Sequence, residues 1–437
     1  MNLTYPKVEA NRQLFLFLAV IAWFLSFSLH PRYTYNTWEG PLWADGAGYF
    51  VYLPASFYYD FDAHAFPDDI EAQMGLGFVL QDDGKVFTKY TYGVALMQLP
   101  VYAFIDGWVR LREAHLLPQG FTVSHQRTAL VAPVLWLLLG LWWLLQWLQR
   151  RFQASVARWV VAALFLGSHL FYYVVDSGAM SHVYSFALFA GLLLLLDGIE
   201  NRSKALKTYG RYLLVGFVAG LILVIRPTNA IFVLFVFLAN AAGWQSLGQK
   251  FLFWMKGSRI ALLLLGLGLA FLPQLLYWKY LSGSWIYYSY QQEGFYWLKP
   301  ALAKFLFAPA GGLFLYAPVY WLAIPGWWFW YKSQPYASLW ALLVFLGSIY
   351  VFSCWHSWNY GGSFGARPLV EYLVLTAPAF AHYVKACLAA ELRWRRFGLL
   401  LLLLLVLWNL KFSLSFNKYF FGTGDWDWQT YWGILFK

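Results

Sequence analysis

The stretch TALVAPVLWLLLGLWWLLQWLQRR, residues 128–151, decides the fold class of this chain. Its first 22 residues carry no charged side chain, and roughly 20 apolar residues are enough for a helix to cross the hydrocarbon core of a bilayer. The run then ends at Arg150 and Arg151, and basic residues accumulate on the cytoplasmic side of membrane proteins. We therefore interpret this segment as a membrane-spanning helix.

The composition of the whole chain agrees with this interpretation. Of its 437 residues, 61% are hydrophobic and 22% are aromatic, whereas only 12% are charged. Soluble domains carry about 25% charged residues, so an ordinary soluble enzyme is excluded, and the many bulky side chains exclude a disordered chain. The net charge of +11 is dispersed along the sequence. We therefore expect membrane lipids as partners and no nucleic acid.

Other apolar segments predict an all-α polytopic membrane protein, with residues 1–437 forming a single transmembrane domain. The apolar segments correspond to about eleven membrane-spanning helices. Their expected ranges are residues 13–29, 128–148, 159–175, 181–198, 211–225, 228–243, 260–278, 313–331, 337–353, 369–387 and 397–414.

The basic residues predict the orientation of these helices. With a cytoplasmic N-terminus, the inner connections hold 17 of the 31 Lys and Arg residues but only four of the 20 Asp and Glu residues. An odd number of spans then places the C-terminus outside. The long outer segments are residues 30–127, 279–312, 354–368 and a C-terminal tail at 415–437. Function is therefore expected to face outward, and acidic outer loops fit a bacterial inner membrane facing the periplasm.

The first outer loop contains two apolar stretches that we do not interpret as spans. A span at residues 92–109 would reverse every later helix and place Arg150 and Arg151 outside. We expect an interfacial helix there, lying along the membrane surface. Residues 49–59 are rich in Tyr and Phe and predict a second interfacial helix.

Asp45 is the acidic candidate in the first outer loop, within the segment WADGAGY at residues 43–49. The flanking glycines permit a tight turn and a close approach of the backbone. A carboxylate beside apolar surface has a raised pKa, which suits a general base. A solvated aspartate that caps a short helix would explain the same pattern.

Four basic residues at the expected outer ends of helices are candidate phosphate ligands. Arg226 precedes Pro227 between two apolar runs, and Arg367 follows a glycine-rich segment that offers backbone N–H donors. Structural salt bridges would explain both arginines equally well. Lys89 and Arg127 bracket the expected interfacial helix and could bind a donor phosphate or lipid headgroups.

Two histidines and an aromatic segment complete the candidates. His182 opens a predicted span and is either a proton-transfer group or a hydrogen-bonded structural histidine. The segment CWHSWNY at residues 354–360 contains Trp355, His356, Trp358 and Tyr360. These side chains suit stacking on a sugar ring, although interfacial aromatic residues have the same composition. The sequence has no zinc-type spacing of Cys and His, so no metal ligand is assigned and no cofactor is expected.

Taken together, these features resemble the polytopic C-type (GT-C) glycosyltransferases, the superfamily of protein mannosyltransferases and aminoarabinose–lipid A transferases. The resemblance covers nearly the whole chain in topology. The local signals are Asp45, Lys89-Tyr90 before an interfacial helix, Arg127, Met180-Ser181-His182, Arg226-Pro227-Thr228-Asn229, Pro309-Ala310-Gly311-Gly312-Leu313-Phe314 and the loop from Trp358 to Arg367.

The resemblance implies an enzyme that transfers a sugar from a polyprenyl-phosphate donor to a hydroxyl of a glycan, lipid or protein on the outer face of the membrane. Asp45 would then be the base, and the basic residues would bind the donor phosphate. The chain departs from the family in two places: Asp45 is followed by Gly46 where many members have a second acid, and His182 stands where many have an acid. A divalent metal is therefore not indicated.

Two other functions use the same residues. A transporter or flippase of lipid-linked sugars would bind the phosphate headgroup without breaking a bond, but such proteins often contain inverted repeats, and this sequence has no evident repeat. A membrane acyltransferase or polysaccharide polymerase would use His182 or His356.

Overall fold

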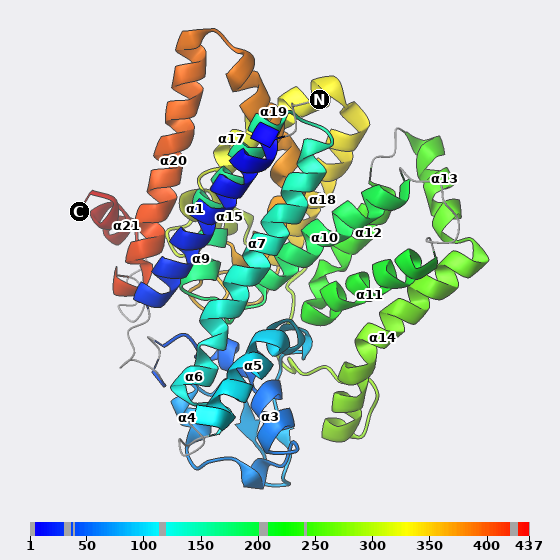
Figure 1. The fold of residues 1–437 in the computed structure, drawn as a ribbon, viewed down its shortest axis with the longest axis vertical. Helices are drawn as coiled ribbons and strands as arrows, with labels where there is room; N and C mark the ends of the chain where they lie inside the picture. Colours follow the sequence, from blue (N-terminus) through cyan, green and yellow to red (C-terminus); the bar gives the residue numbers. More distant parts are fainter. Residues whose placement is uncertain are drawn as a thin grey trace.

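Apolar α-helices build nearly all of the protein, as the sequence predicts for an integral membrane protein. The computed structural model describes residues 5–29, 36–37, 40–112, 119–200, 209–239, 243–419 and 427–436. Within these ranges the only named strands, β1 (Val79–Leu80) and β2 (Val86–Phe87), pair as an antiparallel hairpin. Figure 1 shows long helices side by side, with a lobe of short helices at one end, far from the N-terminus.

In the described part of the chain, six helices are long and apolar enough to cross a membrane. They are α1 (Tyr5–Leu29), α7 (Thr128–Gln149), α10 (His182–Glu200), α14 (Gly257–Ser282), α18 (Pro335–Ser353) and α20 (Leu392–Tyr419). Shorter apolar helices include α8 (Ala154–Leu166), α11 (Tyr209–Ile225), α12 (Ala230–Leu238) and α19 (Leu373–Ala389). The number of spans and their orientation stay predictions.

Two predicted spans are interrupted in the structure. The segment 159–175 divides into α8 and α9 (Leu170–Val175), because Gly167 ends α8 and the Ser168 hydroxyl accepts a hydrogen bond from the Leu170 N–H. The segment 313–331 divides into α16 (Leu313–Tyr316) and α17 (Tyr320–Ser333) around Pro318, which has no N–H to continue a helix.

The ends of other predicted segments also differ from the structure. The expected span 228–243 begins as η4 (Pro227–Asn229) and α12, and residues 240–242 lie outside the described part of the chain. The expected C-terminal tail contains the end of α20 and a further helix, α21 (Trp428–Phe436). Between α12 and α14 the chain forms a further helix, α13 (Trp244–Trp254).

Small residues allow the long helices to pack closely. A Cβ atom added to Gly266 of α14 would lie 2.2 Å from the Leu213 carbonyl oxygen of α11. Added to Gly140 of α7, it would lie 2.8 Å from the Ala187 Cα of α10. Membrane helices associate through such close backbone approaches, since lipid provides no hydrophobic driving force between them.

The lobe in Figure 1 is formed by the elements between α1 and α7, where the sequence predicts the first outer loop. It contains α2 (Asp45–Phe50), α3 (Tyr52–Tyr58), η2 (Ala63–Ala65), α4 (Ile70–Gln73), the hairpin, α5 (Gly93–Arg112) and α6 (Val123–Gln126). The helix expected at residues 92–109 is therefore present as α5, and residues 49–59 fall on α2 and α3. Whether α5 lies along the membrane surface stays a prediction.

Three segments that the sequence predicts to be outer, at residues 30–127, 279–312 and 354–368, meet over the helix ends. An isolated β-bridge joins Phe295 of the second segment to Trp355 of the third. Lys89 of the first segment forms an ion pair with Glu293 of the second. The second segment also contains α15 (Leu302–Phe307), and the third ends at η5 (Arg367–Leu369). Residues far apart in the sequence therefore surround one space.

Candidate functional site

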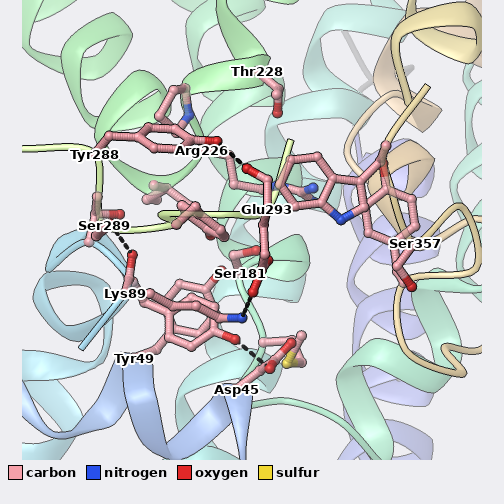
Figure 2. A pocket seen from close by; sticks show the side chains of 18 of the residues that line it. Asp45, Tyr49, Lys89, Ser181, Arg226, Thr228, Tyr288, Ser289, Glu293 and Ser357 are labelled. Carbon is pink, nitrogen blue, oxygen red and sulfur yellow. Dashed lines mark hydrogen bonds and ion pairs between the residues drawn. The ribbon is translucent and has the colours of Figure 1, made fainter. Parts of the chain in front are cut away.

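A cavity of about 540 Å³ lies where the lobe meets the helix ends. Its wall combines Asp45 of α2, Arg226 between α11 and η4, and Arg367 at the start of η5. Loop residues 286–290 and 355–357 close other sides. Figure 2 shows Asp45 and Lys89 on the lobe side and Arg226 on the helix side, with Glu293 between them.

Asp45 is held in the cavity wall by two hydrogen bonds. The Arg367 Nη2 donates to its Oδ2 at 2.9 Å, and the Tyr90 hydroxyl donates to its Oδ1. About a third of the Asp45 side chain, 31%, is exposed. Gly48 allows the Tyr90 ring to pack this close to α2, since a Cβ atom at Gly48 would lie 2.4 Å from that ring. The aspartate is therefore an oriented ion-pair partner and more than a loop residue in solvent.

The pKa of Asp45 differs from the sequence expectation. Burial alone would raise this pKa, but the charge of Arg367, the Tyr90 hydrogen bond and the charge of Lys89 outweigh it and hold the pKa below its ordinary value. The sequence suggested a raised pKa because it showed only the apolar neighbours of Asp45. Its cationic partner lies 322 residues away.

Lys89 lies on the same side of the cavity as Asp45. Its Nζ lies 2.7 Å from Glu293 Oε1 and 5.6 Å from the centre of the Tyr290 ring. The other carboxylate oxygen of Glu293 lies 3.7 Å from His356 Nε2. Glu293 thus places its carboxylate between two groups that could bind an anion.

Arg226 belongs to a second, more buried group at the helix end. Its Nη1 lies 3.3 Å from Glu371 Oε1 and 3.1 Å from His182 Nδ1. Glu371 is fully buried, and 15% of the Arg226 side chain remains exposed. Arg226 also lies in the cavity wall, so one guanidinium faces both a buried carboxylate and the space where a ligand would bind.

The predicted aromatic residues separate into two groups. Trp355, His356 and Tyr360 line the cavity, and Arg367 lies 5.6 Å from the centre of the Tyr360 ring. Trp358 instead packs against the hydrophobic core. Arg127, at the end of α6, lines neither of the two cavities described here, so the structure does not bring it to the other basic residues.

A second, smaller cavity of about 220 Å³ shares part of its wall with the first. Asp45, Arg367 and Tyr360 border both cavities. Tyr173 and Ser363 line only the smaller one. The Asp45–Arg367 pair therefore forms a partition that is accessible from two sides.

Several residues of the site had no assigned role in the sequence analysis. Glu371 is the one acidic residue in the predicted span at residues 369–387, and the sequence there does not show which side chain it contacts. An intramembrane acid is nevertheless a functional signal by itself. Tyr90 adjoins Lys89, but no sequence pattern shows that its hydroxyl reaches Asp45. Glu293 is one of several polar residues in a long outer segment.

The acids and histidines do not form a metal-binding set. Within the described ranges, no group of three or more His, Cys, Asp or Glu side chains is arranged to hold a metal ion. Asp45 is directed at Arg367, and His182 at Arg226 and Glu371.

Comparisons with known proteins find similarity to a solved structure and none at the level of sequence families. No protein-family model and no curated protein matches the sequence. Among solved structures, the chain is similar to the archaeal oligosaccharyltransferase AglB from Archaeoglobus fulgidus, in complex with an inhibitory peptide and a dolichol-phosphate. The two share a TM-score of 0.55 and 11% sequence identity, over 94% of this chain and 56% of AglB.

The protein shares the fold of AglB, a GT-C glycosyltransferase. The resemblance seen in the sequence is thereby confirmed at the level of the fold. The chain spans only 56% of the length of AglB, so the activity and substrates of that enzyme do not transfer with the fold. The roles of residues in this chain depend on the geometry of its own cavity.

Proposed function

We propose that this protein transfers a sugar from a polyprenyl-phosphate donor to an acceptor hydroxyl on the outer face of the membrane. The observation that supports this most is the partition between the two cavities. One carboxylate, Asp45, borders both of them, and basic side chains surround the larger one. Sugar transfer from a lipid phosphate needs a base beside cations.

The donor phosphate would bind in the larger cavity. Arg226, Lys89 and Arg367 all line it, and each is already paired with a carboxylate. Guanidinium groups match the geometry of phosphate oxygens and form charge-assisted hydrogen bonds with them. Trp355 and Tyr360 would contact the sugar or the first units of the polyprenyl chain.

Asp45 would take the proton of the acceptor, which would approach from the smaller cavity. The acceptor oxygen forms a bond to the anomeric carbon while the bond from that carbon to the phosphate oxygen breaks. The proton passes to Asp45, and the polyprenyl phosphate leaves with the bonding electron pair, stabilised by Arg226 and Lys89. Direct displacement inverts the anomeric configuration.

The low pKa of free Asp45 is consistent with activation by the donor. While Arg367 is bound to Asp45, the carboxylate is a weak base, because the cation stabilises its ionised form. A phosphate that recruits Arg367 would remove part of that stabilisation and raise the pKa of Asp45. Asp45 would then become an effective base only when the donor is bound.

Transfer from synthetic donors tests the proposed function. Purified protein in bacterial lipid nanodiscs receives decaprenyl phosphate linked to radiolabelled mannose, glucose, galactose or aminoarabinose, with bacterial lipid and glycan extracts as acceptors. We expect label to move from at least one donor to an acceptor. Binding of these lipids with the donor bond intact in every combination would contradict the proposal and favour a transporter.

A further inference from the structure

The helix α13 carries large apolar side chains that the described part of the chain leaves largely uncovered. Phe251, Leu252 and Met255, at and just beyond its end, are 56%, 70% and 49% exposed. Trp254 points the other way and is buried, with its ring 5.0 Å from that of Phe237 in α12. One side of α13 is therefore fixed to the protein, while an apolar side faces outward.

Polar residues show that α13 does not cross the hydrocarbon core of a bilayer. The helix has 11 residues and includes Gln245, Gln249 and Lys250, whereas a spanning helix needs roughly 20 apolar residues. Gln245 and Gln249 are exposed. A short helix with an exposed apolar side and polar neighbours suits the membrane surface, where its apolar side chains enter the boundary between headgroups and acyl chains.

The length of α14 places α13 at the membrane surface opposite the larger cavity. The 26 residues of α14 span about 39 Å at 1.5 Å per residue, close to the 40–45 Å thickness of a bilayer with its headgroups. Beyond its far end, Trp285 and Ile286 are again exposed, and Ile286 lines the cavity. Figure 1 shows α13 at the end of α14 that is distant from the lobe. Exposed apolar side chains thus lie about one bilayer apart.

The sequence around α13 carries positive charge only. Residues 201–292 contain nine Lys or Arg residues and no Asp or Glu. Lys256, directly before the first residue of α14, is exposed, and Lys250 is partly exposed. Arg259 donates to the Phe253 carbonyl oxygen at 2.8 Å and so fastens the end of α13 to α14. A surface of anionic phospholipids complements such a segment, because basic side chains are attracted to negatively charged headgroups.

We propose that α13 is an in-plane membrane anchor that binds anionic phospholipids of the leaflet opposite the cavity. Phe251, Leu252 and Met255 enter the boundary between headgroups and acyl chains, and Lys250 and Lys256 bind lipid phosphates. Each lysine beside an anionic surface strengthens binding about fivefold. This inference does not depend on sugar transfer, so the two can fail separately.

Spin labels on α13 test its depth in the membrane. A nitroxide-labelled cysteine replaces Phe251 or, as the matched control, Gln249, which is also exposed and lies on nearly the opposite side of the helix. The chain carries Cys354→Ala and Cys387→Ala and is reconstituted in nanodiscs of phosphatidylethanolamine and phosphatidylglycerol. We expect the label at 251 to collide more often with oxygen dissolved in the bilayer than with an aqueous nickel complex, and the label at 249 to show the reverse.

Two results would overturn the anchor. Equal access of the nickel complex to both labels would place the whole helix in water. Protection of the label at 251 from both reagents would mean that a protein partner or a second copy of the chain covers this side of α13.

Lipid affinity tests the role of the lysines. Native mass spectrometry measures the tightest binding of phosphatidylglycerol and of phosphatidylcholine to the protein in detergent. Lys250→Gln/Lys256→Gln should lower the affinity for phosphatidylglycerol about 25-fold and leave that for phosphatidylcholine unchanged. Lys299→Gln/Lys304→Gln is the matched control, because it removes the same charge from two exposed lysines outside α13, and it should bind both lipids as wild type does.

A single variant guards against a loss of folding. Lys250 also donates to the Ala239 carbonyl oxygen, whereas Lys256 is exposed. Lys256→Gln alone should therefore keep the wild-type melting temperature and lose about fivefold in phosphatidylglycerol affinity. Wild-type affinity in both lysine variants, or an equal loss for phosphatidylcholine, would contradict the binding of anionic headgroups.

Discussion

Arg226 provides the most informative prediction, because the same guanidinium faces a buried acid and the proposed phosphate. Arg226→Gln removes a charged partner from Glu371, which is fully buried. An uncompensated buried charge costs about 3–5 kcal/mol. The hydrogen bond that remains between Glu371 and His182 places the expected loss of stability at the lower end, about 3 kcal/mol. The melting temperature should therefore fall clearly.

Lipid binding should weaken for a different reason. A hydrogen bond to a charged group contributes about 1.5–3 kcal/mol, and each 1.4 kcal/mol is about tenfold in affinity. Arg226→Gln should thus raise the Kd for decaprenyl phosphate by roughly 10- to 150-fold. Arg259→Gln is the matched control, because Arg259 is partly exposed, contacts Phe253 and does not line the cavity.

The double variant Arg226→Gln/Glu371→Gln separates these two effects. It removes both charges, so most of the lost stability should return while lipid binding stays weak. Thermal unfolding and lipid binding are measured on the same nanodisc preparations. A Kd for Arg226→Gln within twofold of wild type would refute the phosphate role, as would restored lipid binding in the double variant.

Three further changes have definite expected outcomes. Arg367→Gln removes the cation that lowers the pKa of Asp45, so the carboxylate protonates at a higher pH. In a pH profile, the acidic limb of the transfer rate should shift to higher pH. An unshifted limb would argue against the ion pair between Asp45 and Arg367. Gly48→Ala places a methyl carbon 2.3 Å from the Gly77 carbonyl oxygen, which should lower both the melting temperature and the rate of sugar transfer. Wild-type values of both would show that the backbone relaxes without cost. Glu293→Gln frees Lys89 from its 2.7 Å ion pair and should tighten the binding of bare decaprenyl phosphate several-fold. Stability should change little, since both side chains are about one-third exposed. Weaker binding of the lipid would mean that Glu293 itself supports the ligand.

The fold was largely predictable because hydrophobicity along the sequence determines membrane helices. The stretch at residues 128–151 forms α7 almost as expected. The interruptions at Gly167 and Pro318 were missed, since apolar side chains continue through both and the break depends on backbone bonding. The helix α21 was missed because it is short and follows polar residues.

The site was predictable as a set of residues but not as a set of contacts. Asp45, Arg226 and Arg367 stand out because charged side chains in apolar surroundings need partners. The sequence could not show which partner each one has, because Asp45 and Arg367 are 322 residues apart. The pairing of Arg226 with Glu371 likewise joins residues 145 positions apart.

The central claim is that Asp45 takes the acceptor proton beside a lipid phosphate, and single-turnover transfer by Asp45→Asn tests it most directly. Replacing the carboxylate by an amide of the same shape removes the base and releases Arg367, so decaprenyl phosphate should bind at least as tightly as in wild type. Loss of a general base lowers rates by about 10²–10⁴-fold, and we predict a fall of that size in sugar transfer with the donor still bound. Transfer at the wild-type rate by Asp45→Asn would contradict the account.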